Sequence, residues 1–190
     1  MPAARPPRKT KAGTHVALLR GINVGGRNTL PMARLVGLFE DAGCERVRTY
    51  IQSGNVVFEA PAARARLVPA AVTAAIAAEL GLDVPIVTRT AAELEQIVSA
   101  NPFVAPGTDL GLLHVGFLAD RPNAARGAAL DPDRSPPDEF ALHEGELYLR
   151  CPNGMARTKL TNAYFDATLR TVTTIRNWRT TLKLLELSRT

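Results

Sequence analysis

The chain has 190 residues and a formal charge of +5, with 46% hydrophobic but only 5% aromatic residues. This length suits one ordinary domain or two small ones, with a mainly aliphatic core. No apolar run is long enough for a transmembrane helix, and the N-terminus lacks the apolar segment of a signal peptide. The sequence therefore predicts a cytoplasmic protein without membrane contact.

Positive charge is concentrated at the two ends of the chain. Residues 1–14 hold four basic residues and no acid, and residues 150–190 hold eight basic residues against two acids. Residues 1–13 also lack apolar periodicity, so we expect them to form a disordered basic tail. A general nucleic-acid binder usually spreads positive charge along one face, so the local excess near the C-terminus is the more informative feature.

The first half alternates between strand and helix patterns. Apolar residues recur at helical spacing in two segments, which end at Gly43 and Gly81. The turn residues Ser53-Gly54-Asn55 separate two strand patterns. In chain order we expect a strand at 15–19, a helix from 31, strands at 47–52 and 56–58, a helix at 66–80 and a strand at 84–87.

The same order recurs in the second half. Thr90 and Glu93 have the spacing of a capping box, which marks a helix start. The acids of the proline-rich segment 131–138 are expected to be solvated. In chain order we expect a helix from 90, a strand at 112–118, a weak helix at 122–130, strands at 140–142 and 147–149, a helix around 160–167, a strand at 172–175 and a final helix from 178.

Both halves thus have the order β-α-β-β-α-β, which is that of the split βαβ or ferredoxin-like unit. We expect an α+β fold of two such α/β-plait units with antiparallel sheets. The first domain is predicted at residues 14–89, and the second, with extra helices, at residues 90–190.

The most informative local feature is a glycine loop, residues 21–28, between the first predicted strand and the first predicted helix. Glycines let backbone N–H groups approach a ligand, and basic and amide side chains supply further donors. Gly21 and Gly26 have P-loop spacing, but Arg27 and Asn28 stand where that motif has lysine and serine or threonine. An NTPase loop is therefore not expected, and we favour an anion-binding loop over a simple turn. Its candidate ligand-binding residues are Arg20, Gly21, Asn23, Gly25, Gly26 and Arg27.

Two further polar clusters follow predicted strands. Gln52, Ser53 and Asn55 have ordinary turn chemistry, and they would add donors if they face the glycine loop. Asn177 is predicted to cap the last helix, whose N-terminus attracts anions, and Arg176 adds a full charge there. Lys159, placed with Arg157 at the start of the preceding helix, completes the set of candidate ligand-binding residues. The alternative is that Asn177 is only a cap and Trp178 a core anchor.

The glycine loop and the 176–178 turn each lie at the carboxyl end of a strand, where α/β folds tend to bind ligands. We therefore expect both to face one positive cleft between the domains, suited to a phosphate or carboxylate. Arg176→Ala should then weaken anion binding and leave folding intact, since truncating an exposed arginine costs little stability.

Three functional alternatives remain open. The favoured one is a binding protein for a small phosphate- or nucleotide-like anion, and the second is an enzyme acting on such a ligand. Nucleic-acid binding is the weakest, because the RNP1 pattern is absent. No catalytic base or nucleophile stands out, and no residue spacing indicates a metal site or a cofactor. The oligomeric state is not indicated.

Four segments give the chain a specific resemblance to a known bacterial family. They are VALLRGINVGGRNTLPM, VRTYIQSGNVVFE, GMARTKLTN and TTIRNWRTTLKLLEL. Together they resemble the skeleton of the domain of unknown function 1697 family, over about residues 14–187. The resemblance implies two α/β-plait domains, in agreement with the periodicity, and it implies no activity. The basic tail lies outside it.

Overall fold

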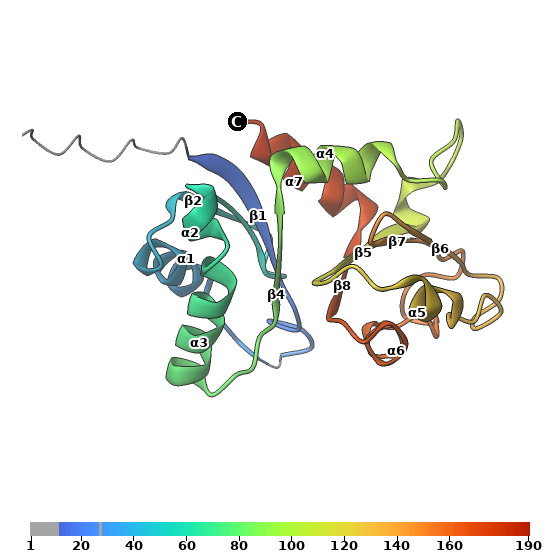
Figure 1. The fold of residues 1–190 in the computed structure, drawn as a ribbon, viewed down its shortest axis with the longest axis horizontal. Coiled ribbons are helices and arrows are strands. Elements are labelled where there is room, and N and C mark those ends of the chain that lie inside the picture. The colour runs from blue at the N-terminus through green and yellow to red at the C-terminus, as the bar shows by residue number, and fades with distance from the viewer. Residues whose placement is uncertain (1–11, 27) are drawn as a thin grey trace, which may run out of the picture.

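The computed structural model describes residues 12–26 and 28–190, and Figure 1 shows their arrangement. The tail expected at 1–13 lies outside the described residues except for its last two positions, and Gly13 already belongs to the first strand. Arg27 also lies outside them. The described chain forms two four-stranded antiparallel sheets with helices, so the expected pair of ferredoxin-like units is confirmed.

The first sheet has the strand order β2-β3-β1-β4. Its central strands β1 and β3 pair in antiparallel register, with Ala17 opposite Val56. Its strands are β1 (Gly13–Leu19), β2 (Glu45–Tyr50), β3 (Asn55–Ala60) and β4 (Ile86–Thr90). Its helices are α1 (Met32–Asp41), α2 (Ala62–Ala65) and α3 (Val68–Leu80).

Strand β1 is apolar on both faces because both faces of the first sheet are covered. Ala17 and Leu19 pack with α1 and α3 in one core. Val16 and Leu18 alternate with them and pack into a second core on the opposite face. A strand buried on both sides reads as a continuous apolar run, which is why this segment shows no polar alternation.

The second sheet repeats the topology with the order β6-β7-β5-β8. Its strands are β5 (Leu113–Leu118), β6 (Glu139–His143), β7 (Glu146–Arg150) and β8 (Thr173–Asn177). Its helices are α5 (Ala124–Ala128) and α6 (Asn162–Leu169). Three further elements flank it: α4 (Ala91–Ser99), the 3-10 helix η1 (Leu110–Leu112) and α7 (Trp178–Ser188).

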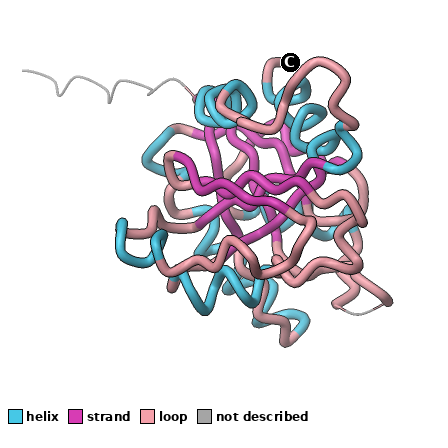
Figure 2. Tube along the Cα trace, turned by 90° about the vertical axis from the view of Figure 1, so that its right-hand side faces the viewer, coloured by secondary structure: helices cyan, strands magenta, loops and turns pink. Residues whose placement is uncertain are grey.

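The two sheets share one apolar core. Leu18 and Val57 of the first sheet belong to the same buried cluster as Val115 and Phe117 of the second. Helices α4 and α7 pack against each other beside this junction, above the sheets in Figure 1. Figure 2 shows the strands gathered in the middle of the molecule with the helices around them. The division at residues 89 and 90 therefore stays a prediction about domains that are in close contact.

Some local expectations need correction. Arg157 and Lys159 do not begin a helix, because the hydroxyl of Thr161 accepts from Tyr164 N at 3.2 Å and caps α6 there. Asp138 of the proline-rich loop is only 8% exposed, and its Oδ2 accepts from Ser135 Oγ at 2.8 Å. In the described part of the chain, no helix combines the length and the apolar character needed to cross a membrane.

Candidate functional site

The glycine loop contacts the turn between β2 and β3. The Asn23 amide group donates to Leu30 O at 3.0 Å and to Gln52 O at 2.9 Å, and its Oδ1 accepts from Leu30 N at 2.8 Å. Asn28 donates to Gly21 O at 2.9 Å. Both asparagines therefore shape the loop, and the donors that remain for a ligand are mainly backbone N–H groups.

The glycines of this loop are required by backbone conformation and leave open space beside them. The φ angle is positive at Gly21, Asn23, Gly25 and Gly26. It is not positive at Ile22 or Val24, so positive and ordinary values alternate along the loop. Such alternation is typical of backbone nests, in which successive N–H groups converge on an anion. A Cβ added at any of the three glycines would meet no atom within 4 Å. A ligand can therefore approach this backbone closely.

Arg176 reaches from β8 into the first unit. Its Nε donates to Asn55 Oδ1 at 2.6 Å, and its Nη2 donates to Leu19 O at 2.5 Å and to Ser53 O at 3.2 Å. Its Nη1 donates to Thr174 Oγ1 at 2.9 Å. The glycine loop, the turn and β8 thus meet, but the donors of Arg176 are used within the protein.

The acceptors of Arg176 are all neutral: an amide, a hydroxyl and backbone carbonyls. Among the described residues, no carboxylate lies within ion-pairing distance of it. Burial lowers the pKa of this guanidinium to about 10, so it still carries its charge at neutral pH. An uncompensated positive charge therefore lies at the end of β1, where the glycine loop begins.

Arg20 forms the second link between the units. Its Nη1 pairs with Asp166 Oδ2 on α6, and Asp166 Oδ1 accepts from Thr173 N at 2.7 Å. Nε and Nη2 of Arg20 have no hydrogen-bond partner within residues 12–26 and 28–190, and the side chain is 26% exposed. Arg20 therefore keeps donors for a ligand even though its charge is balanced.

The remaining sequence-predicted residues divide into two groups. Asn55 is buried in the same network as Arg176, and Gln52 and Ser53 supply the carbonyls beside it. Asn177 instead caps α7, its Oδ1 accepting from Arg179 N at 2.9 Å. Lys159 is exposed in the loop before α6, where its backbone N donates to Ser135 Oγ at 3.0 Å. Within residues 12–26 and 28–190, neither Asn177 nor Lys159 is hydrogen-bonded to the glycine loop.

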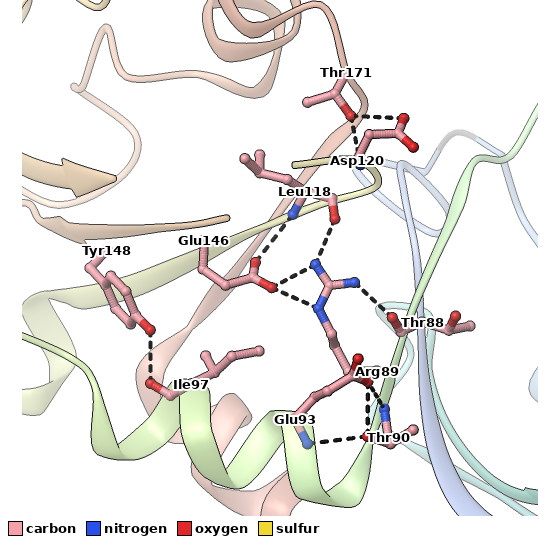
Figure 3. Close-up of polar contacts among 10 residues, drawn as sticks. All are labelled: Thr88, Arg89, Thr90, Glu93, Ile97, Leu118, Asp120, Glu146, Tyr148 and Thr171. Carbon is pink, nitrogen blue, oxygen red and sulfur yellow. Dashed lines mark hydrogen bonds and ion pairs between the residues drawn. The ribbon is translucent and has the colours of Figure 1, made fainter. Parts of the chain in front are cut away.

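A second polar centre was not expected from the sequence. Figure 3 shows Arg89 of β4 directed at Glu146 of β7, between the backbones of Thr88 and Leu118. Its Nε and Nη2 both lie 2.6 Å from Glu146 Oε1, and Nη2 also donates to Leu118 O at 2.6 Å. Glu146 Oε2 accepts from Leu118 N at 3.2 Å. This buried ion pair ties the last strand of the first unit to the second sheet.

A pocket of about 320 Å³ opens beside this ion pair, between α4, the end of β5 and the β6–β7 turn. Glu146 is only 6% exposed. Burial raises the pKa of its carboxyl to about 7, although Arg89 favours the ionised form. Burial also raises the pKa of Tyr148 to about 12, and its hydroxyl donates to Ile97 O at 3.0 Å. The sequence signal was weak: an arginine in an apolar strand, and a glutamate beside a hairpin turn.

The fold and these polar contacts define an α+β protein of two ferredoxin-like units joined by a shared core and by arginine contacts. The chain belongs to the family described as "Protein of unknown function (DUF1697)", which it matches over residues 13–148. It resembles the conserved bacterial protein SP0830 from Streptococcus pneumoniae, with a TM-score of 0.69 and 22% identity. The match covers 94% of this chain and 99% of that one, and it supports the fold. No curated protein matches the chain.

Proposed function

We propose that the protein binds a small phosphate- or nucleotide-like anion at the glycine loop, where the two units meet. The observation that carries this proposal is the charge of Arg176, which is held by neutral acceptors at the end of β1. Inside a protein such a charge is weakly screened, so it favours an anion even without touching it.

Direct contacts would come from the loop itself and from Arg20. The open backbone at Gly25 and Gly26 offers N–H groups, and Arg20 keeps two nitrogens without a partner in the described structure. Asp166 holds one end of the Arg20 guanidinium, so less conformational freedom is lost when a ligand binds. Gln52 is exposed on the adjoining turn and Lys159 on the loop before α6. Both remain proposed ligand-binding residues.

The proposal is tested by following backbone amides in an NMR titration of the full chain with inorganic phosphate and with adenosine monophosphate. The amides of Gly21, Gly25 and Gly26 should shift saturably, and chloride at equal ionic strength should not reproduce the shifts. Amide shifts scattered beside many surface lysines and arginines, or no shifts at all, would contradict a site at this loop.

Two variants distinguish a direct contact between Arg20 and the ligand from nonspecific attraction by surface positive charge. Arg20→Gln should weaken phosphate binding at least about tenfold, because a hydrogen bond to a charged group contributes about 1.5–3 kcal/mol. The matched control is Arg66→Gln, an exposed arginine in the segment between α2 and α3, which should leave the affinity within twofold. An equal loss in both variants would show only nonspecific attraction.

A further inference from the structure

Two exposed apolar side chains lie at the proposed anion site. Val24 belongs to the glycine loop and Ile51 to the β2–β3 turn, and each is more than half exposed. The hydrogen bond from Asn23 Nδ2 to Gln52 O at 2.9 Å joins the two backbone segments that carry them. Single exposed apolar residues are ordinary on a protein surface. A pair brought together from two segments at one site is more informative.

Neither side chain contributes to the core. The described residues form three buried apolar clusters, and Val24 and Ile51 are neither in them nor among the partly buried side chains packed against them. Among residues 12–26 and 28–190, five large apolar side chains are exposed, and two of the five are these. Their apolar surface is therefore available to a ligand that approaches the loop.

The backbone of Ile51 is strained. Its φ angle is 48°, in the left-handed region where Cβ comes close to the following carbonyl oxygen. Six non-glycine residues of the described chain have a positive φ, and Ile51 alone among them is β-branched. Such a residue at positive φ is a genuine outlier, and strain of this kind is concentrated at functional sites. Core packing does not explain it, because the side chain is exposed.

The same turn borders the buried positive charge. Arg176 Nη2 donates to Ser53 O at 3.2 Å, two residues after Ile51. The open backbone of Gly25 directly follows Val24. An anion held at the loop therefore has apolar surface on both segments beside it. Burying an apolar part of that ligand against Val24 and Ile51 adds to the affinity.

We infer that the anion bound at the glycine loop is a phosphate monoester that carries an aromatic group, and that this group lies against Val24 and Ile51. The inference rests on the proposed function and narrows it. An aryl phosphate or a nucleoside monophosphate has the required aromatic part, whereas inorganic phosphate and a sugar phosphate lack it. Ile51 is then a residue that determines specificity, since it contacts the organic part of the ligand and not the phosphate.

The test is calorimetric titration of the full chain with phenyl phosphate, inorganic phosphate, adenosine monophosphate and ribose 5-phosphate at one ionic strength. The first and third should bind at least about tenfold more tightly than the second and fourth, which lack the aromatic group. A gain for phenyl phosphate alone would restrict the class to aryl phosphates. A gain for adenosine monophosphate alone would assign recognition to the polar edge of the base and overturn the apolar contact.

The remaining outcomes distinguish this inference from the proposed function on which it rests. Equal affinities for all four compounds would overturn the inference and leave the anion site in place. No saturable binding of any of them would contradict the proposed function as well.

Ile51→Asn separates ligand contact from a role in folding, because asparagine tolerates a positive φ and is polar. The affinity for phenyl phosphate should fall at least about fivefold, whereas that for phosphate should stay within about twofold. The midpoint of urea unfolding should rise, because the backbone strain is relieved. An unchanged affinity for phenyl phosphate would show that Ile51 makes no contact, and a lower urea midpoint would show that it serves the fold. Either result overturns the inference.

The matched control is Leu67→Asn, which changes another exposed apolar side chain, between α2 and α3. Both affinities should stay as they are in the unchanged protein. If Ile51→Asn does not fold, Val24→Thr decides the matter, because threonine keeps the β-branched shape. It should weaken phenyl phosphate binding about threefold and leave phosphate binding unchanged.

Nuclear Overhauser effects locate the aromatic group directly. The ring protons of bound phenyl phosphate should show contacts with the methyl groups of Val24 and Ile51. Contacts found instead with Leu67 or Leu80, which are also exposed, would place the ring elsewhere and refute the inference.

Discussion

Arg176 joins β8 to the ends of β1 and β3 through hydrogen bonds to Leu19 O and Asn55 Oδ1. Removing its side chain leaves Asn55 Oδ1 and Leu19 O without these hydrogen bonds. A buried acceptor that loses its partner costs about 1–3 kcal/mol. The side chain is therefore a structural tie as well as the source of local positive charge.

We accordingly predict that Arg176→Ala destabilises the protein by about 3 kcal/mol, measured by urea unfolding. This replaces the expectation from the sequence that the substitution leaves folding intact, which assumed an exposed side chain. The control is Arg179→Ala, whose side chain is 73% exposed and 3.8 Å from Asp109. It should change stability by less than about 0.5 kcal/mol. A loss in Arg176→Ala as small as that expected for Arg179→Ala would show that the Arg176 contacts contribute little to stability.

We predict that His114 makes the free energy of unfolding depend on pH in the acid range. It is 8% exposed, and its Nδ1 has no partner within the described structure. Burial lowers the pKa of this imidazole below its ordinary 6.5, so the unfolded chain takes up a proton that the folded chain does not. Stability from this group is therefore complete above pH 6.5 and falls as the pH drops below it. Urea unfolding between pH 5 and 7.5 should show this slope reduced in His114→Gln, and an unchanged slope would exclude His114 as its source.

In the turns that connect the elements, Gly54 and Gly25 both have a left-handed backbone, but they differ in the space around them. A Cβ at Gly54, with φ of 74°, would lie 2.8 Å from the Leu19 Cβ, whereas one at Gly25, with φ of 57°, would meet nothing within 4 Å. A left-handed backbone alone costs a residue with a Cβ about 1–2 kcal/mol. A clash with a packed side chain adds to this cost.

We predict that Gly54→Ala destabilises the protein by at least about 2 kcal/mol more than Gly25→Ala does, on the scale of overpacking costs. Urea unfolding of the two variants side by side measures the difference. Similar losses would mean that the β2–β3 turn yields to the added methyl group and that its contact with β1 is loose.

Most helices and strands could be predicted because their patterns are local. The capping box at Thr90 and Glu93, for example, forms as expected. Strand β4 begins at Ile86 instead of 84, a shift that periodicity cannot resolve. The expected meeting of the glycine loop, the β2–β3 turn and Arg176 is found, but its hydrogen bonds could not be predicted, and ligand binding there stays a prediction. The hydrogen bond from Arg176 to Leu19 joins residues 157 positions apart, and no local pattern reveals how many donors such a contact uses.

For the whole molecule, the question is how strongly the two units depend on each other. Their sheets share the buried cluster of Leu18, Val57, Val115 and Phe117. Arg20, Arg89 and Arg176 add polar links across the same junction. An interface that resembles a domain core favours joint unfolding, since neither half can expose its part of the cluster without cost.

We predict that Leu18→Ala, in the first unit, also lowers the stability of the second. Leu18 is 1% exposed in the shared cluster, and truncating a buried leucine costs about 2–5 kcal/mol. Native-state hydrogen exchange should show the slowest amides of β1 and β3 and those of β5 and β7 losing protection together, with fluorescence of Trp178 following the same transition. Leu67→Ala, at a side chain that is 68% exposed, should change neither set. Protection of β5 and β7 that stays unchanged in Leu18→Ala would instead establish two independently stable domains, with a boundary near residue 90.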